Sequence, residues 1–414
     1  MSALEERLRD LPVPEDDAAE ERAWLVISAA YADRAQAPAR RPVRRLVAAA
    51  AAAVAVAVLA LTPAGAEVVD VVRDVVGIED AQTLPELGPL PAAGELLVDS
   101  EAGPWIVRDD GSKHQLGDYG QSTFSAPRGL FVAATDGRRL VALGPTGEVR
   151  WTVTAPATVS DARWAPSGFR VAYRSGDDLR VVSGDGTGDH LVAGGVAPVA
   201  PAWRPTASLK LAAAVGEPGP EQLTYVDAGG RVHLVDADTG ETIRGGASPA
   251  ALFNRDRYGP LRQIAWSASG ERFVGSWDRA LFAEVIGHGP NPSDAEYVAT
   301  RGDRITETAL APRGDDVAVI ERGGGTSTIR RIEFNRGHAS DTTLFAGPGA
   351  VEGLKWSPDG RWLLAGWRDA DQWLFIRADR PRRLVAIDEV TEQFAPEGGD
   401  AAFPRVSGWV LPQR

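Results

Sequence analysis

The sequence predicts an all-β fold: a seven-bladed β-propeller, preceded by a short helical tail and one transmembrane helix. Three observations lead to this prediction. A short motif that begins with a large apolar residue and, in all copies but one, ends with glycine recurs at intervals of 40, 39, 63, 44 and 46 residues. Each copy is followed by a stretch of alternating polarity. A window of 21 residues near the N-terminus contains no charge, whereas both of its flanks are charged.

Composition limits the function classes before any motif is considered. The 414 residues hold 44 basic and 57 acidic side chains, a net charge of -13, and no cysteine. The missing cysteines exclude disulfides, thiolate metal sites, a cysteine nucleophile and a lipidated cysteine anchor. The acidic balance argues against nucleic acid as a partner. Residues 67–414 account for almost all of the net charge, because they carry 36 basic and 48 acidic side chains.

Residues 1–45 are predicted to form a cytoplasmic tail with short helices. Leu4, Leu8 and Leu11 recur at helical spacing, and a second helical pattern includes Trp24 and Tyr31. Segments of this size bury too little apolar surface to fold firmly alone. The tail is therefore either a solvated segment that precedes an anchor or a peptide that folds on a cytoplasmic regulator.

Residues 46–66 are predicted to cross a membrane once. As a helix, this uncharged window extends about 31 Å, enough for a hydrocarbon core of about 30 Å. Four arginines precede it at positions 40, 41, 44 and 45, so the N-terminus is expected in the cytoplasm and residues 67–414 outside it. A buried alanine-rich helix and a signal peptide cleaved after Ala64-Gly65-Ala66 are the alternatives.

Residues 67–93 are predicted to form an amphipathic helix at the membrane surface, followed by a stiff spacer. Valines between positions 68 and 76 are interrupted by Asp70, Arg73 and Asp74, which is typical of an amphipathic helix. Prolines at 85, 89 and 91 favour an extended linker. The propeller then occupies residues 94–414.

The repeat is defined by a β-turn motif that follows a large apolar residue. Its copies are Trp164-Ala-Pro-Ser-Gly168, Trp203-Arg-Pro-Thr-Ala207, Trp266-Ser-Ala-Ser-Gly270, Leu310-Ala-Pro-Arg-Gly314, Trp356-Ser-Pro-Asp-Gly360 and the degenerate Phe124-Ser-Ala-Pro-Arg-Gly129. In this motif proline presets φ at the first central position, and glycine accepts a positive φ at the end. The large residue is expected to end the inner strand of a blade.

A strand of alternating polarity is predicted after each turn, at 130–134, 170–173, 210–215, 272–276, 316–320 and 361–366. Further strands and glycine-rich turns complete each unit. A period of about 40–45 residues is typical of propeller blades. The tryptophans predicted to mark blades are Trp164, Trp203, Trp266, Trp356 and Trp409.

Both ends of the repeat region supply an incomplete seventh blade. Pro404–Pro412 has the pattern of an inner strand with its tryptophan, and residues 95–98, 104–108 and 113–116 have the pattern of strands without an anchor motif. Joined, they complete a blade, and 321 residues shared among seven blades give about 46 each, close to the observed interval. Closure of the ring removes exposed sheet edges. A six-bladed ring is the alternative.

The motif resembles the turn of the WD40-like repeats in periplasmic TolB-type propellers. Trp356-Ser-Pro-Asp-Gly360 matches that turn completely, and the other copies depart from it by one to three positions. The likeness is clear over 124–376 and looser over 94–414. It implies the fold and says little about function, because propellers carry unrelated activities.

The sequence contains none of the common catalytic signatures. It has no P-loop, no His-Glu-x-x-His and no Gly-x-Ser-x-Gly motif. Its five histidines fall at unrelated positions of the blade pattern. We therefore expect no catalytic residue, no metal site, no cofactor and no enzymatic activity.

A binding surface is predicted where the loops after the second strand of each blade gather on one face. An extra loop at 247–263 is expected on this face. Aromatic and arginine side chains are favoured as interface anchors. The candidate partner-binding residues are Phe253, Arg255, Arg257, Tyr258, Trp277, Asp278, Arg279, Arg322, Arg368 and Asp369.

Together these features predict a membrane-anchored, extracytoplasmic propeller that acts as a protein- or ligand-binding module or sensor. The expected partner is an extracytoplasmic protein or an envelope polymer. One alternative is a transmembrane regulator of the anti-sigma type, whose tail 1–45 binds a cytoplasmic partner. The other is a propeller hydrolase with its active site inside the ring.

Overall fold

The computed structural model describes residues 80–84, 87–125, 129–205, 221–244, 255–285, 295–335, 338–380, 383–395 and 401–411. These residues belong to one compact unit, which spans 55–414. Among them, no helix has the length and apolar character needed to cross a membrane. The predicted tail, the predicted span at 46–66 and the amphipathic helix predicted after it lie outside the described residues.

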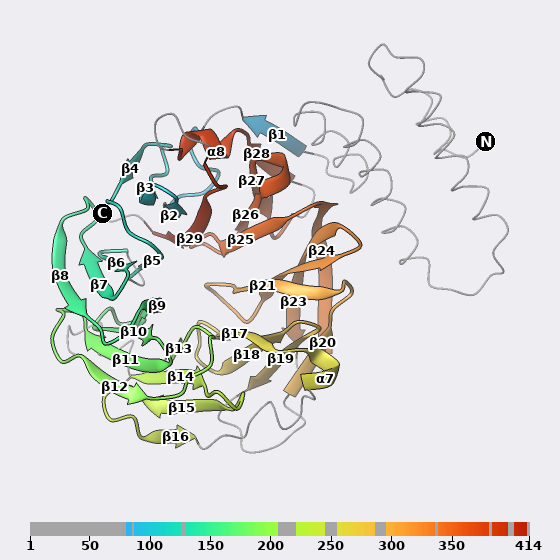
Figure 1. The fold of residues 1–414 in the computed structure, drawn as a ribbon. Helices are drawn as coiled ribbons and strands as arrows, with labels where there is room; N and C mark the ends of the chain where they lie inside the picture. Colours follow the sequence, from blue (N-terminus) through green and yellow to red (C-terminus); the bar gives the residue numbers. More distant parts are fainter. Residues whose placement is uncertain are drawn as a thin grey trace, which may run out of the picture. The chain divides into compact units, whose positions relative to one another are not determined.

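The described chain forms seven sheets, antiparallel except for one added strand, that follow one another around a ring (Figure 1). Each sheet is one blade, and each blade has its innermost strand first in the order below. Blade 1 contains β29 (Arg405–Val410), β2 (Glu95–Ser100), β3 (Gly103–Val107) and β4 (Lys113–Gln115). Blade 2 contains β5 (Ser122–Phe124), β6 (Val132–Asp136), β7 (Arg139–Leu143) and β8 (Val149–Thr154).

Blades 3 to 5 continue the same order. Blade 3 contains β9 (Val159–Trp164), β10 (Arg170–Ser175), β11 (Asp178–Ser183) and β12 (His190–Ala193). Blade 4 contains β13 (Ala202–Arg204), β14 (Gln222–Val226), β15 (Val232–Asp236) and β16 (Thr242–Arg244). Blade 5 contains β17 (Leu261–Trp266), β18 (Arg272–Trp277), β19 (Ala280–Val285) and β20 (Ala295–Ala299), and the helix α7 (Arg255–Tyr258) precedes it.

Blades 6 and 7 complete the ring. Blade 6 contains β21 (Arg304–Leu310), β22 (Val317–Gly323), β23 (Thr326–Asn335) and β24 (His338–Pro348). Blade 7 contains β25 (Val351–Trp356), β26 (Trp362–Trp367), β27 (Gln372–Arg377) and β28 (Arg383–Ile387). Two short helices accompany blade 7, η2 (Arg368–Ala370) and α8 (Val390–Gln393).

Closure of the ring by both ends of the repeat region is confirmed. The C-terminal strand β29 pairs antiparallel with β2, with Glu95 opposite Val410 and Asp99 opposite Arg405. The ring therefore has seven blades, and the six-bladed alternative is wrong.

One strand lies where the sequence predicted only a spacer. The strand β1 (Asp80–Leu84) pairs in parallel with β28 and makes blade 7 a five-stranded sheet. Part of the range 67–93 is thus a strand rather than a linker. The free outer edge of β28 explains this, because its unpaired backbone groups can accept one more strand.

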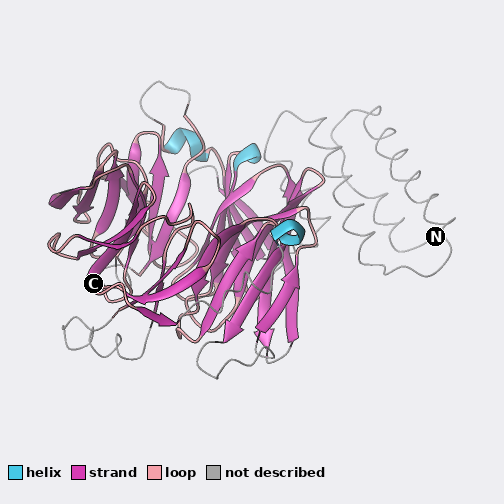
Figure 2. Cartoon of the chain, turned by 60° about the horizontal axis from the view of Figure 1, so that its bottom comes forward, coloured by secondary structure: helices cyan, strands magenta, loops and turns pink. Residues whose placement is uncertain are grey.

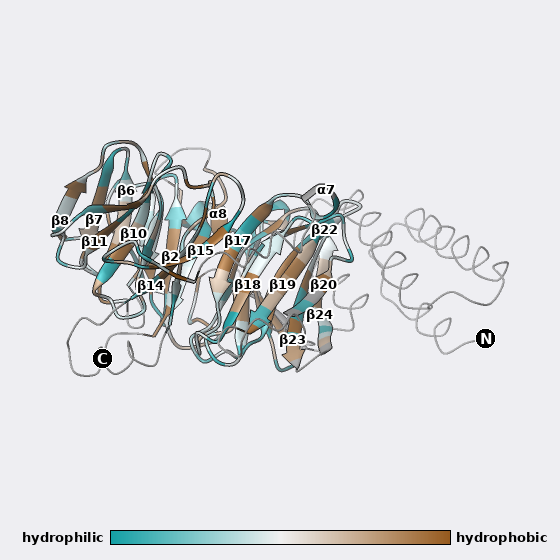
Figure 3. Ribbon diagram, turned by 90° about the horizontal axis from the view of Figure 1, so that it is seen from below, coloured by the Kyte–Doolittle hydropathy of each residue, from teal (hydrophilic) through white to brown (hydrophobic). Residues whose placement is uncertain are grey.

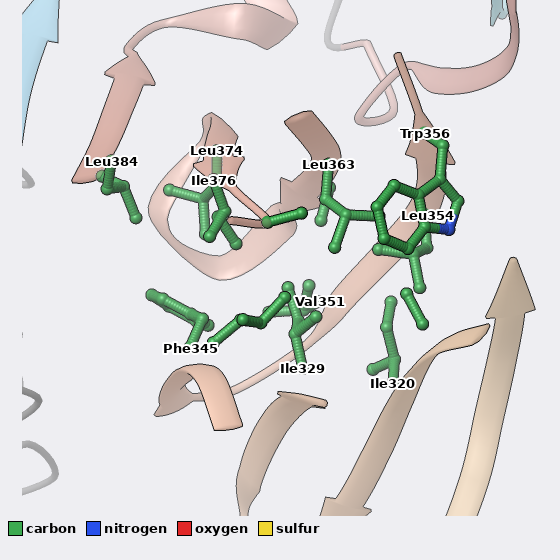
Figure 4. Close-up of a cluster of buried hydrophobic side chains, with 14 of the residues drawn as sticks. Ile320, Ile329, Phe345, Val351, Leu354, Trp356, Leu363, Leu374, Ile376 and Leu384 are labelled. Atoms are coloured by element: carbon green, nitrogen blue, oxygen red, sulfur yellow. The ribbon is translucent and has the colours of Figure 1, made fainter. Parts of the chain in front are cut away.

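The apolar core lies between the blades rather than at one centre. One cluster of buried side chains fills each of the seven interfaces between neighbouring blades. Figure 4 shows the cluster between blades 6 and 7, where Ile320 and Ile329 meet Leu363 and Leu374. Alternation along each strand supplies one apolar row to each neighbour, which is the pattern that the sequence showed.

The motif residues end innermost strands, as predicted. Trp164, Trp266, Leu310, Trp356 and Phe124 are the last residues of their strands. Trp203 and Trp409 lie one residue before the end of theirs. The indole Nε1 of Trp356 donates a 2.9 Å hydrogen bond to the carbonyl oxygen of Ala309 in the preceding blade. The motif tryptophans thus join blades and are structural.

One predicted strand is not the second strand of its sheet. The sequence favoured 210–215 as the second strand of blade 4, but β14 (Gln222–Val226) occupies that place. Residues 206–220 lie outside the described part of the chain. The second strand of blade 4 therefore begins later in the sequence than predicted, which is consistent with the longer interval between Trp203 and Trp266.

Candidate functional site: an arginine-lined hollow on one face of the ring

The turns after the second strand of each blade share a face with the connections between blades. The short helices mark this face: they lie along one rim of the propeller in Figure 2, and α7 and α8 are labelled at the same rim in Figure 3. A direct bond joins a connection to a turn, because the backbone N–H of Arg279 donates to the carbonyl oxygen of Tyr258 at 3.0 Å. The motif turns lie on the opposite face, since strands alternate in direction.

The predicted loop 247–263 contains α7 and the first residues of β17. Phe253 lies outside the described residues, and so does the side chain of Arg255. Arg257 is exposed, with its guanidinium 5.2 Å from the ring centroid of Tyr258. Tyr258 is half-buried and packs against the small cluster around Trp277. Arg257 and Tyr258 therefore do lie on the predicted face.

Trp277 does not present a surface to a partner. Its side chain is only 3% exposed and packs edge-on against Phe282, with ring centroids 6.4 Å apart. Asp278 forms an ion pair with Arg262 at 2.7 Å. Arg279 is exposed. Of this triplet, Arg279 is the side chain most available for an interaction, and Trp277 belongs to the core of blade 5.

A hollow lies at the same rim between blades 6 and 7. Its volume is about 470 Å³. The lining residues are Asp303, Arg304, Arg322, Gly323, Gly324, Gly325, Thr326, Gly349, Ala350, Arg368 and Asp369. We call it the Arg322 hollow. It brings together three of the predicted site residues, namely Arg322, Arg368 and Asp369.

The arginines of the Arg322 hollow have few internal partners. The guanidinium of Arg322 donates to the carbonyl oxygen of Val351 at 3.2 Å, while its Nε is buried with no hydrogen-bond partner in the described structure. Arg368 is half-exposed and lies 4.0 Å from Glu352, at the limit of an ion pair. Arg304 is exposed and forms no ion pair with any described residue. The exposed donors of Arg304 and Arg368 are available to a ligand.

The two aspartates of the hollow are already bound to the main chain. Oδ2 of Asp369 accepts a hydrogen bond from the backbone N–H of Ala350 at 3.1 Å. Gly349 makes this approach possible, because a Cβ at that position would lie 1.9 Å from the same oxygen. Oδ2 of Asp303 accepts a longer bond, 3.4 Å, from the N–H of Gly324. Bonds of this kind use part of each carboxylate's capacity to accept hydrogen bonds.

The hollow is thus a cationic site on an acidic protein. Three arginines and two aspartates line it, within a chain whose net charge is -13. Guanidinium groups bind carboxylates and phosphates through paired hydrogen bonds. The glycines at 323–325 leave one wall without side chains, so a ligand can approach the backbone there. The arrangement suits an acidic group of a partner.

The connection between blades 4 and 5 and the hollow lie next to each other. The backbone N–H of Ile305, the residue after Arg304, donates to the carbonyl oxygen of Asp278. The carbonyl oxygen of Arg279 accepts a hydrogen bond from Thr300 at 3.1 Å. Arg257, Tyr258 and Arg279 therefore form one flank of the same surface.

Sequence reasoning missed Arg304, Asp303 and the glycine wall. Arg304 begins the inner strand of blade 6, whereas the prediction considered only the turns after second strands and the loop 247–263. The run Arg322-Gly-Gly-Gly325 was the available signal, because three glycines in a turn mark a place where backbone is exposed. Among the described residues, no group of three or more His, Asp or Glu side chains is placed to hold a metal ion.

Comparisons with known proteins give no argument about function. No family model matches the sequence, and no curated protein matches it. The likeness to TolB-type propellers therefore rests on the motif residues alone. One structural neighbour is a chain in the crystal structure of a mitotic checkpoint complex, with a TM-score of 0.49, 15% identity, and coverage of 71% of this chain and 90% of that one. Another is apo AztD from Citrobacter koseri, with a TM-score of 0.46, 9% identity, and coverage of 71% and 98%. Identities this low say nothing about function.

Proposed function

We propose that this protein is a non-enzymatic binding module: a membrane-anchored, extracytoplasmic propeller that captures an acidic segment of a partner protein at the Arg322 hollow. A β-propeller is an architecture that fits a protein-binding module. The neighbouring flank of Arg257, Tyr258 and Arg279 extends the contact beyond the hollow. Aromatic and arginine side chains of this kind are common anchors in interfaces.

The observation that supports the proposal most is the set of arginine side chains in the hollow. Arg304 is exposed and forms no ion pair with any described residue, and Arg368 is half-exposed and lies 4.0 Å from Glu352. Arg322 donates one hydrogen bond, to the carbonyl oxygen of Val351, at the wall of a hollow of about 470 Å³. A carboxylate in the hollow would accept hydrogen bonds from guanidinium groups of this set.

The location is supported by the sequence. The uncharged window at 46–66 follows four arginines and precedes an acidic domain. This layout favours a span with the propeller on the outer side. Extraction of membranes with alkaline carbonate and protease treatment of intact cells test this part. Release of the chain by carbonate, or protection of the propeller from protease, would contradict it.

Photo-crosslinking tests the binding surface. A benzophenone amino acid is placed at Arg304, inside the hollow, and in a second variant at Arg313, in the motif turn of the same blade on the opposite face. We expect a discrete adduct from position 304 alone. Its partner, identified by mass spectrometry and then purified, should bind the propeller through an acidic segment.

Matched substitutions then test the arginines. Arg322→Ala with Arg368→Ala should weaken binding of the purified partner by about tenfold or more. Arg313→Ala with Arg361→Ala removes two exposed arginines from the opposite face of the same two blades and should leave affinity unchanged. Equal effects of the two pairs, or the same adducts from both crosslinking positions, would refute the hollow as the binding site.

A further inference from the structure

Three cationic side chains gather at the centre of the ring, away from the Arg322 hollow. They are Arg163 of β9, Lys355 of β25 and Arg405 of β29, all on innermost strands. Blade 2 separates blade 3, which holds Arg163, from blade 1, which holds Arg405. The innermost strands of these two blades both line the axis of the ring, so side chains that face inward from them share the central space.

Two of the three cations bind no carboxylate in the described structure. The guanidinium of Arg163 donates to the carbonyl oxygen of Ala162 at 2.8 Å, and the ammonium of Lys355 donates to that of Leu354 at 3.2 Å. Both acceptors belong to the preceding residue of the same strand. The third cation, Arg405, lies 3.8 Å from Glu307. The cations therefore retain donors that are not used within the protein.

The nearby carboxylates are already engaged. Glu307 accepts hydrogen bonds of 2.9 Å from the backbone N–H groups of Gly353 and Leu354. Asp99 accepts hydrogen bonds from the hydroxyl and the N–H of Ser122. Asp161 binds Arg174 at 3.0 Å. The neutral donors leave the charges of Glu307 and Asp99 in place. The three cations and Arg174 therefore face three carboxylates, and one positive charge is left unbalanced.

The inner strands bring these groups together through a local distortion. The pairing of β25 with β26 shifts register between Glu352 and Lys355, and Gly353 within this bulge has a φ of +72°. A Cβ on Gly353 would lie 3.9 Å from Cγ of Arg405. The bulge thus sets β25 against β29 and re-aims the residues that follow it, as bulges commonly do.

The pKa shifts of Lys355 and Arg163 are consistent with one site that contains all three cations. The pKa of Lys355 is lowered to about 8, chiefly by burial; Arg405 and Arg163 contribute to the lowering, and Glu307 and Asp99 oppose it. Burial also lowers the pKa of Arg163; Asp161 and Asp99 oppose this effect, and Arg405 adds to it. The side chain of Arg163 nevertheless has solvent-accessible surface. A side chain that is surrounded by protein and still reached by water fits a position on the axis.

We infer that the axis of the ring holds an oxyanion-binding site, formed by Arg163, Lys355 and Arg405, for a small ligand that carries a carboxylate or phosphate group. Such a ligand would accept hydrogen bonds from two guanidinium groups and one ammonium group. It would also relieve the repulsion among the three cations. This site is separate from the Arg322 hollow and does not depend on the proposed partner.

The small number of lysines permits a direct test. The chain contains only Lys113, Lys210 and Lys355. Reductive methylation of the full-length protein in non-ionic detergent with isotope-labelled formaldehyde gives one NMR signal for each lysine and one for the N-terminus. Lys355→Arg identifies the signal of Lys355. Inorganic phosphate and citrate are then titrated separately.

We expect one or both anions to shift the Lys355 signal in a saturable way and to raise its pKa by roughly 1, because a nearby anion favours the charged form. A response to phosphate alone assigns a phosphate ligand, and a response to citrate alone assigns a carboxylate ligand. Arg163→Gln should weaken binding by about tenfold or more. Arg361→Gln and the paired Arg322→Ala, Arg368→Ala variant should bind as the wild type does.

Two outcomes would overturn the inference. One is a Lys355 signal that neither anion moves. The other is an identical titration in wild type and Arg163→Gln, which would mean that the anions only screen charge. Circular dichroism of each variant establishes that it is folded before its titration is compared.

Discussion

The indole Nε1 of Trp203 donates a hydrogen bond of 2.9 Å to the main-chain carbonyl oxygen of Arg163, in the preceding blade. The bond links a residue that marks a blade to a residue that belongs to the proposed oxyanion site. Trp356 makes the same kind of bond to Ala309. The repeat motif therefore fixes the inner strand of the neighbouring blade, and with it the position of any group that the strand presents to the axis.

Substitution of Trp203 should lower the free energy of unfolding more than substitution of a tryptophan whose indole N–H makes no hydrogen bond. Trp203→Phe removes the hydrogen bond to Arg163, which is worth about 1 kcal/mol. Trp409 is the matched control, because it is equally buried and its Nε1 has no partner in the described structure. We expect Trp203→Phe to lower the free energy of unfolding by about 1 kcal/mol more than Trp409→Phe in urea titrations. Equal losses would show that the bond is not stabilising.

Blade 6 contains a buried ion pair. Substitution of both partners should destabilise the protein less than substitution of one partner alone. The guanidinium of Arg330 lies 2.5 Å from Glu321 and 3.0 Å from Asp341, and both Arg330 and Glu321 are almost fully buried. Arg330→Met leaves Glu321 as an unpaired buried charge, at a cost of about 3–5 kcal/mol. We expect the double variant with Glu321→Gln to recover part of this loss in denaturant titrations.

The exposed pair between Arg150 and Glu148 is the control for that experiment. Its side chains are 51% and 43% exposed, and the distance is 2.7 Å. Arg150→Met should cost about 1 kcal/mol or less. A loss at Arg330 that is no larger than the loss at Arg150, or a double variant less stable than Arg330→Met, would contradict the prediction.

Asp99 should make the stability depend on pH. Burial raises its pKa from 3.8 to about 6, against the lowering effect of hydrogen bonds from Ser122. Between these two values the folded state binds more protons than the unfolded state, so stability falls as the pH rises from about 4 to about 6. Above that range the ionised carboxylate of Asp99 lowers the free energy of unfolding by a constant amount. Asp99→Asn should remove this contribution.

The measurement is the free energy of unfolding of wild type and Asp99→Asn at several pH values. The difference between the two curves should change between about pH 4 and pH 6 and become constant above it. Taking the difference cancels other groups, such as Glu221, whose pKa burial also raises. A difference that does not vary with pH would refute the assignment.

Substitution of Gly270, in a motif turn, should destabilise the protein for two reasons, its positive φ and a close backbone contact. Gly270 has a φ of +73°, and a Cβ there would lie 1.5 Å from the carbonyl oxygen of Pro205 in the preceding blade. Gly270→Ala should therefore cost about 2 kcal/mol or more. Gly137 has a φ of +57°, and a Cβ there would meet no atom within 4 Å, so Gly137→Ala should cost only about 1 kcal/mol. Thermal unfolding of both variants measures the difference, and similar melting temperatures would contradict it.

The sequence determined the architecture well because the motif has a fixed physical role. A turn that needs proline and glycine, placed after a large apolar residue, predicted where the innermost strands end. Closure of the ring by the strand that contains Trp409 could be predicted because each end of the repeat region holds an incomplete blade. The strand β1 was missed because its five residues, which end just before Pro85, show neither alternation nor an apolar run.

The candidate site was predictable only in part. Arg322 lies near the end of a second strand and Arg368 directly follows one, so their face could be derived from chain direction alone. Trp277 could not be placed correctly, because whether an aromatic side chain packs inward depends on neighbours such as Phe282 and Tyr258. The central group of Arg163, Lys355 and Arg405 joins three distant stretches of sequence, and no local pattern connects them.

The pairing of β29 with β2 has a consequence for synthesis. The first blade is begun by β2, β3 and β4 and completed by β29, so the inner edge of β2 stays unpaired until β29 has been synthesised and has left the ribosome. A truncated product would keep that edge permanently open. Unpaired edges recruit strands from other molecules, so premature termination should yield an aggregating species rather than a smaller propeller.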